Sequence, residues 1–159
     1  MDTEFQRDLE AARGAEILVR DVFSGLTEDY TFEDVAAERS FFYRGDIRAI
    51  RKVDGKEIYI EVKDDSRIAD TGRILCEEEV YFKYIDYYSA GNMQSDYDIY
   101  CVVSQSERKI YILDFKVLQK VYTKGEFKVI PHSKTDTYCY LLDICEARRL
   151  GALIQVLEY

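Results

Sequence analysis

The clearest alternation of apolar and charged positions lies in residues 41–63, FFYRGDIRAIRKVDGKEIYIEVK, on either side of Asp54-Gly55. This pattern predicts two antiparallel strands joined by a tight turn, because Asp-Gly supplies the positive φ angles of a two-residue hairpin loop. We expect Val53 to pair with Lys56 across the turn. Since side chains alternate between the faces of a strand, one face is apolar and buried. That face would carry Ile47, Ala49, Ile58, Ile60 and Val62.

The opposite face of the predicted hairpin carries Asp46, Arg48, Glu61 and Lys63. The same pairing sets Asp46 opposite Lys63, with Glu61 one diagonal away. Two carboxylates and one ammonium group are therefore expected at the end of the hairpin that lies away from its turn. An ordinary explanation is also open, because exposed strand faces carry cross-strand ion pairs worth about 0.2–1 kcal/mol each.

An amphipathic helix is predicted over residues 4–24, where apolar residues recur at steps of three and four. Its stripe consists of Phe5, Leu9, Ala12, Val19 and Phe23. Glu16 falls on this stripe. It has two interpretations: a carboxylate at the edge of the stripe, in solvent or paired with Arg20, or a carboxylate directed to the inner side, where a metal site would need it.

The rest of the chain alternates between short strand and helix patterns, which predicts a single α/β domain over residues 1–159, with helices covering a mixed sheet. Two regions have few apolar positions and are expected to be connections: 27–40, with one helical turn at 32–37, and the charged loop 64–72. The other predicted elements are a helix at 80–88 ended by Gly91, a hairpin at 97–115, a helical turn at 116–122 capped by Asp114, a strand at 126–130, a strand at 137–144, a helix at 146–150, and a last segment, 153–159, that is strand or helix.

The composition and the N-terminal residues indicate the cellular compartment in which we expect the protein. The N-terminal MDTEFQRDLE lacks the basic and apolar regions of a secretory signal, and no stretch is long enough to span a membrane, so we expect a cytoplasmic protein without a membrane partner. The four cysteines have no CxxC spacing, which favours buried thiols of a reducing compartment over zinc ligands. The single histidine, His132, has no nucleophile at a recognisable spacing.

The formal net charge of −9 has the strongest bearing on function. Proteins that hold nucleic acid mainly through phosphate contacts are usually basic, so this charge disfavours tight passive binding. Two classes of protein remain compatible with this charge: a metal-dependent enzyme with locally concentrated basic groups, or a protein that binds a basic partner. Arg44, Arg48 and Arg51 make the first hairpin locally basic and are the candidate phosphate-facing residues, unless they simply balance charge on the strand face.

The charged face of the hairpin suits divalent-metal chemistry. Mg²⁺ takes hard oxygen ligands and often only one or two protein carboxylates, which Asp46 and Glu61 would supply. Lys63 shares their face and is placed to orient an attacking hydroxide or to neutralise developing phosphate charge. The spacing therefore fits metal-assisted hydrolysis of a phosphodiester.

Asp46, followed fifteen positions later by Glu61-Val62-Lys63 and preceded by the helix ARGAEILVRDVF, resembles the PD-(D/E)xK nuclease superfamily, which includes restriction endonucleases. The resemblance covers roughly residues 10–120, with Gly45 in place of the usual proline. It implies a restriction-endonuclease-like core with a central mixed sheet flanked by helices, and Mg²⁺- or Mn²⁺-dependent cleavage of nucleic acid, chiefly DNA. Asp46, Glu61 and Lys63 would be catalytic, with Glu16 as an auxiliary metal ligand.

The run EVKDDSRIADTG further suggests a small phage- or bacteria-encoded branch of this superfamily. A homodimer is compatible with it, because a small domain without an extensive basic groove gains grip on a duplex from a second subunit. The other hypothesis is a non-catalytic acidic protein on the same fold, which binds a protein partner or imitates nucleic acid as an inhibitor.

A second set of charges, Asp98 followed by Asp114-Phe115-Lys116, has the same residue types. We prefer the first set because it follows the helix that carries Glu16 and because its three charges share one face. Asp114 is better explained as the N-cap of the following helix, where a carboxylate accepts from free backbone N–H groups.

Overall fold

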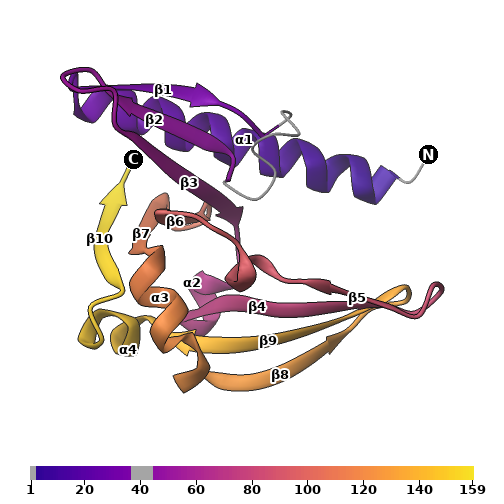
Figure 1. The fold of residues 1–159 in the computed structure, drawn as a ribbon. Helices are drawn as coiled ribbons and strands as arrows, with labels where there is room; N and C mark the ends of the chain where they lie inside the picture. Colours follow the sequence, from indigo (N-terminus) through magenta and orange to yellow (C-terminus); the bar gives the residue numbers. More distant parts are fainter. Residues whose placement is uncertain (1–2, 37–44) are drawn as a thin grey trace.

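The computed structural model describes residues 3–36 and 45–159, in which one long helix and two β-sheets form successive layers (Figure 1). The helices are α1 (Thr3–Leu26), α2 (Ile68–Thr71), α3 (Phe115–Val121) and α4 (Ile144–Arg149), with the 3₁₀ turns η2 (Asn92–Gln94) and η3 (Tyr122–Lys124). The strands are β1 (Tyr30–Asp34), β2 (Ile47–Arg51), β3 (Glu57–Asp64), β4 (Arg73–Phe82), β5 (Tyr87–Ala90), β6 (Ile99–Ser104), β7 (Lys109–Asp114), β8 (Glu126–Pro131), β9 (Thr135–Asp143) and β10 (Leu153–Glu158).

The larger sheet has six strands in the order β1-β2-β3-β6-β7-β10. Its β3–β6 pair is parallel and all its other neighbours are antiparallel, so the sheet is mixed. Helix α1 covers one face, and residues of α3 pack against the other. The prediction of an α/β fold with a mixed sheet flanked by helices is therefore confirmed.

The first core layer lies between α1 and the six-stranded sheet. Ala15 and Val19 of α1 are buried against residues of β2, β3, β6 and β7. The predicted helix is present, but its predicted stripe is wrong at the N-terminal side: Leu9 is 55% exposed and Ala12 is exposed. The N-terminal half of α1 projects beyond the sheet in Figure 1, so apolar residues there have no strand to cover.

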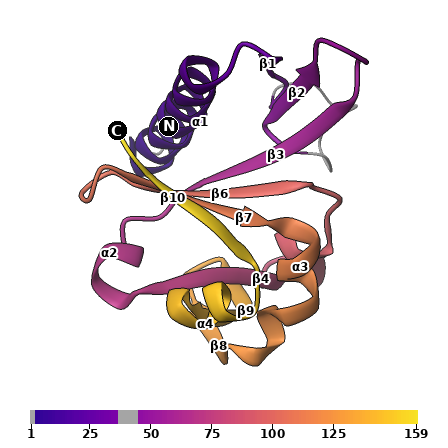
Figure 2. The same cartoon turned by 90° about the vertical axis from the view of Figure 1, so that its left-hand side faces the viewer.

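The second core layer lies on the other face of the six-stranded sheet. Tyr100 and Leu113 from that sheet are buried together with Ile74 and Leu142 from the smaller sheet, which has the order β5-β4-β9-β8. Figure 2 shows the two sheets one above the other, with α3 and α4 beside the smaller one. This second sheet is the main feature of the fold that the sequence pattern did not predict.

Two predicted helical segments are strands. Residues 80–88 were expected to form a helix with Phe82 and Ile85 directed inward, but β4 and β5 form a hairpin there, and Ile85 is 70% exposed. The turn expected at 32–37 belongs partly to β1, whose residues alternate in burial and pair with β2. In both cases long-range strand pairing overrides a short local periodicity, which cannot by itself separate helix from strand.

The first hairpin is present, but its register differs from the predicted one by two residues. Ile47 pairs with Ile60 and Ala49 with Ile58, and the backbone N–H of Arg51 donates to the carbonyl of Lys56. The loop is therefore longer than a two-residue turn. Since side chains repeat every two residues along a strand, a shift of two keeps every residue on its predicted face.

The predicted elements after residue 96 are present: the hairpin of β6 and β7, α3 with its Asp114 cap, β8, β9, α4 and a final strand. The charged loop 64–72 contains the short helix α2, whose Ile68 is buried. Cys76, Cys101 and Cys139 are buried thiols as predicted, but Cys145 is exposed. Across residues 3–36 and 45–159, no helix combines the length and apolar character that a membrane crossing requires.

The Asp114 cap gives a direct test of this part of the fold. The Asp114 carboxylate accepts from the backbone N–H of Val117 at 3.1 Å. We expect Asp114→Ala to lower the free energy of unfolding by about 1 kcal/mol, because a free N–H loses its partner. Asp114→Asn retains a capping oxygen and should cost much less. Thermal unfolding followed by circular dichroism measures both, and equal losses in the two variants would contradict the capping role.

Candidate active site

Asp46 lies immediately before β2 and is fixed by hydrogen bonds at three points. Its N–H donates to the carbonyl of Ile60 at 2.8 Å, and its own carbonyl accepts from the N–H of Val35 at 2.9 Å. Its carboxylate accepts from the backbone N–H of Val62 at 2.9 Å. The Asp46 side chain therefore lies beside Glu61, between Ile60 and Val62, rather than opposite Lys63 as the predicted register had it.

Gly45 makes this arrangement sterically possible. Its φ of +107° is rarely adopted by residues with a side chain, and a Cβ added there would lie 2.5 Å from the carbonyl oxygen of Ile60. No other residue type fits this position without moving the backbone of β3. The glycine before Asp46 is thus explained by a close approach of two backbones.

The partial burial of Glu61 and Lys63 follows from the position of β3 in the middle of the six-stranded sheet. Strand β3 pairs with β2 on one side and β6 on the other, so its polar side chains are partly buried. The Lys63 ammonium lies 3.7 Å from a Glu61 carboxylate oxygen, and the two side chains are 38% and 12% exposed. Asp46, Glu61 and Lys63 line one cavity of about 440 Å³.

Glu16 of α1 interacts electrostatically with Asp46 and Glu61, but it is not one of the residues that line this cavity. Desolvation raises the pKa of Glu16 to about 7, helped by the negative charges of Asp46 and Asp34. The pairing with Arg20 that the sequence left open is not the contact present, because the Arg20 guanidinium lies 3.5 Å from Asp21.

The electrostatics of the site are dominated by excess negative charge. Desolvation is the largest effect raising the pKa values of Glu61 and Asp46, and the Asp46 charge raises that of Glu61 further. Burial lowers the pKa of Lys63, but Glu77 and Glu61 more than offset this, so the net shift is upward. One ammonium group therefore does not compensate the carboxylates around it.

The donor set is suited to a hard divalent cation. Among residues 3–36 and 45–159, no three His, Cys, Asp or Glu side chains are gathered closely enough to hold a metal ion unaided. Mg²⁺ does not require such a cage, because it commonly takes one or two carboxylates and keeps several waters. Asp46 and Glu61 would supply the oxygens, and the cavity of about 440 Å³ leaves room for water.

The second sheet contributes a wall of the cavity that sequence analysis missed. Asn92 is buried; its side-chain oxygen accepts from the N–H of Glu77 at 3.1 Å, and its amide donates to the Tyr100 hydroxyl at 2.9 Å. It thus ties β4 to β6 next to Lys63. A Cβ on Gly91 would lie 2.4 Å from the Glu77 carbonyl oxygen, so only glycine allows this approach. In the sequence, the only feature that points to this role of Asn92 is the glycine directly before it.

The arginines predicted to face phosphate are engaged in ion pairs. Arg48 pairs with Glu33 and lies 3.6 Å from Glu57, and Arg51 pairs with Asp54. Arg44 lies outside the residues that the structure describes. The role of all three in binding nucleic acid stays a prediction.

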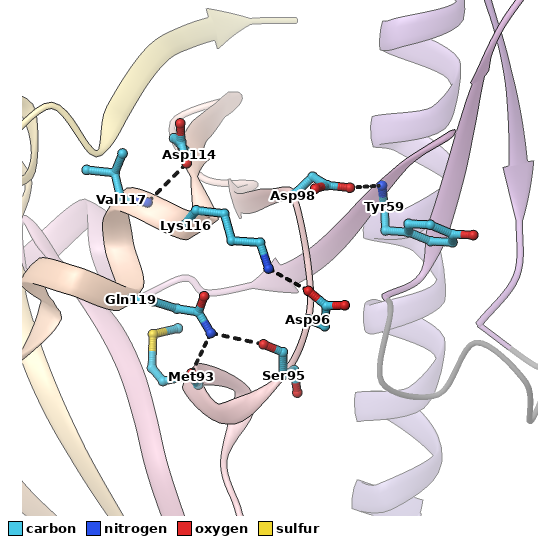
Figure 3. A network of polar contacts seen from close by, with 9 residues as sticks. All are labelled: Tyr59, Met93, Ser95, Asp96, Asp98, Asp114, Lys116, Val117 and Gln119. Atoms are coloured by element: carbon cyan, nitrogen blue, oxygen red, sulfur yellow. Dashed lines mark hydrogen bonds and ion pairs between the residues drawn. The ribbon is translucent and has the colours of Figure 1, made fainter. Parts of the chain in front are cut away.

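The second set of charges is used structurally (Figure 3). The Asp98 carboxylate accepts from the N–H of Tyr59, Asp114 caps α3, and Lys116 forms an ion pair with Asp96. The three charges have separate partners instead of sharing a cavity, which agrees with the preference for the first set.

Comparisons with known proteins add one distant likeness. No protein-family model matches the chain, and no curated protein matches it. Among solved structures, the chain is similar to D212, a nuclease from a fusselovirus, over 96% of this chain and 94% of that one, with a TM-score of 0.44 and 10% sequence identity.

We expect Gly45→Ala to destabilise the protein more than Gly55→Ala. Both glycines have positive φ, which costs a residue with a side chain about 1–2 kcal/mol. Only at Gly45 does the added Cβ also collide with backbone, whereas at Gly55 it meets open space. Chemical denaturation of the two variants measures the difference. Equal destabilisation would show that the approach to Ile60 imposes no constraint.

Glu61→Gln should stabilise the metal-free protein at neutral pH. Desolvation and the Asp46 charge raise the pKa of Glu61 to about 8, so folding must either bury its charge or bind a proton there, whereas Gln keeps the shape of the side chain and needs neither. A gain of about 1 kcal/mol corresponds to a rise in Tm of about 2–4 °C for a protein of this size. Differential scanning calorimetry with a chelator present measures it, with Glu10→Gln on the exposed side of α1 as the control. A lower Tm for Glu61→Gln would contradict the excess of negative charge.

Proposed function

We propose that this protein is a Mg²⁺- or Mn²⁺-dependent nuclease of the PD-(D/E)xK type that hydrolyses phosphodiester bonds in DNA. The observation that carries the proposal is the cavity of about 440 Å³ lined together by Asp46, Glu61 and Lys63. These residues lie in the order and on the elements that the motif requires: an aspartate before β2, and a glutamate and a lysine two residues apart on β3.

Asp46 and Glu61 would hold the metal ion, with Glu16 as an auxiliary ligand. A bound divalent cation supplies Lewis-acid polarisation of the phosphate and lowers the pKa of a bound water. The fit rests on the desolvated carboxylates, whose mutual repulsion a cation would relieve, and on the hydrogen bond from Val62 that fixes Asp46 before any ligand arrives.

Lys63 would stabilise the negative charge that develops on the phosphate and orient the attacking water. Its ammonium is partly exposed to the cavity and is held near Glu61, so it need not reorganise when the substrate binds. The excess of carboxylates over basic groups in the cavity would repel phosphate without a metal ion, which accounts for an acidic chain acting on an anionic substrate only when the ion is present.

We expect Mg²⁺ or Mn²⁺ to produce cleavage of duplex or single-stranded DNA that a chelator prevents. Asp46→Asn and Lys63→Ala should each lower the rate by at least about a hundredfold, since each removes a group that acts on the reacting phosphate. Lys116→Ala is the matched control, because its lysine belongs to the rival motif and should leave the rate unchanged. Gel assays with labelled single-stranded and double-stranded DNA and RNA measure the rates and identify the substrate class.

Binding of the ion is measured separately. Mg²⁺ or Mn²⁺ should raise the Tm of the wild type, and Asp46→Asn should abolish that rise, because a ligand that binds only the folded state stabilises it. Cleavage that persists in Asp46→Asn and Lys63→Ala would overturn the assignment. Absence of both cleavage and a metal-dependent rise in Tm would favour a non-catalytic acidic protein on this fold.

A further inference from the structure

The smaller sheet carries a continuous row of aromatic rings on one face, which we call the aromatic platform: Tyr81, Tyr88, Tyr138 and Phe127. Tyr81 and Tyr88 are stacked, with ring centroids 4.6 Å apart. Tyr88 lies 6.2 Å from Tyr138, which lies 6.4 Å from Phe127. The row thus crosses all four strands, from the edge strand β5 to the edge strand β8.

The platform is not part of either core. Tyr88 is 49% and Phe127 is 51% exposed, and neither belongs to the two clusters of buried residues. Only at its inner end does the row meet the core, where Phe127 contacts Tyr140 and Tyr140 contacts the buried Tyr122. Exposed apolar side chains gathered in one place are a feature of interaction sites.

The charges on the platform face are mainly acidic. Strand pairing sets Glu79 level with Tyr138 and Asp136 level with Tyr81. Asp86 accepts a hydrogen bond from the Tyr81 hydroxyl at 2.9 Å. Desolvation raises the pKa of Tyr88, and so do Tyr138, Glu79 and Asp86.

Lys134 is exposed in the turn between β8 and β9 at this end of the sheet, while Lys83 is already paired, 2.9 Å from Asp136. Glu79, by contrast, forms no ion pair within residues 3–36 and 45–159, although it is half-buried beside the rings. A carboxylate without a cation next to exposed ring faces is the chemistry that receives a guanidinium, by a charge-assisted hydrogen bond and a cation–π contact together.

We propose that the aromatic platform is a docking surface for an arginine-bearing segment of a protein partner. The guanidinium groups of that segment would lie over Tyr88 and Phe127, with Glu79 as an ionic partner. The net charge of −9 attracts such a segment from a distance. The surface adjoins the cavity that holds Asp46, because Tyr87, Ser89 and Ala90 of β5 line that cavity. The inference rests on the rings and charges of the platform and not on the proposed nuclease activity.

Single-stranded nucleic acid is the other ligand that aromatic rows on sheets bind. Such sites combine stacking with a basic groove that follows the phosphates. Here the groups beside the rings are the carboxylates of Glu79, Asp86 and Asp136. Asp136 neutralises Lys83, and Lys134 in the adjoining turn does not balance the remaining carboxylates. The local charge therefore disfavours nucleic acid and favours a cationic peptide.

Binding of a fluorescein-labelled nona-arginine peptide to the full chain, measured by fluorescence anisotropy, tests the proposal. We expect Tyr88→Leu and Phe127→Leu each to weaken binding by about two- to fivefold, because a ring face is lost while apolar bulk remains. Glu79→Gln should weaken it by a similar factor. Tyr84→Leu is the aromatic control, since Tyr84 is 79% exposed at the hairpin tip outside the platform. Glu10→Gln, on the exposed side of α1, is the charge control.

The outcome that supports the proposal is loss of affinity in the three platform variants with both controls unchanged. Equal losses in Glu79→Gln and Glu10→Gln, with no effect of Tyr88→Leu, would show that only net charge attracts the peptide and would overturn it. Binding of a single-stranded oligothymidine that depends on Tyr88 would also overturn it, in favour of a nucleic-acid surface. Circular dichroism melting of every variant excludes unfolding as the cause.

Discussion

The close approach of the Gly45 backbone to Ile60 is the contact on which the geometry of the candidate site depends. It brings the residue before β2 against β3, so that the Asp46 carboxylate can accept from the N–H of Val62. The N–H of Val62 thus donates to the Asp46 side chain instead of to a backbone carbonyl of the neighbouring strand. This hydrogen bond holds the Asp46 carboxylate next to Glu61. The hydrophobic layer beneath α1 supports the arrangement, because Ile47, Ile60 and Val62 are buried on the opposite face of the same strands.

The smaller sheet completes the site from the other side. It is built mainly from the chain between β3 and β6 and from the chain after α3, so residues distant in sequence close the cavity. Asn92 joins these parts, since its side chain satisfies both the N–H of Glu77 and the hydroxyl of Tyr100. A buried amide with both of its polar ends paired specifies one relative position of the two sheets, and that position brings Glu77 near Lys63.

Local chemistry explains which parts of this structure could be predicted from the sequence. The faces of β2 and β3 follow from alternation alone, and they stay correct although the register was wrong by two residues. The register itself depended on the loop, where the Asp54 side chain accepts from the N–H of Lys56 and the turn is wider than Asp-Gly implied. Residues 80–88 could not be assigned from their periodicity, because residues 80–82 pair with β9, about fifty residues away, and this pairing provides the strand on which β5 folds back. The roles of Gly91 and Asn92 depend entirely on such distant contacts.

The ordinary explanation of the charged hairpin face, a set of cross-strand ion pairs, can be weighed on physical grounds. Paired charges lower the pKa values of the carboxylates involved, as Arg51 does for Asp54, whose pKa falls to about 2. At the candidate site the pKa values of Asp46, Glu61 and Glu16 shift upward instead. Desolvation is the largest cause for each, and the negative charge of Asp46 adds to the rise for Glu61 and Glu16. An arrangement selected for stability alone would not bury carboxylates at this cost. These buried carboxylates therefore differ from a structural ion-pair network, and their shared negative charge is the feature that a bound divalent cation, as proposed above, would neutralise.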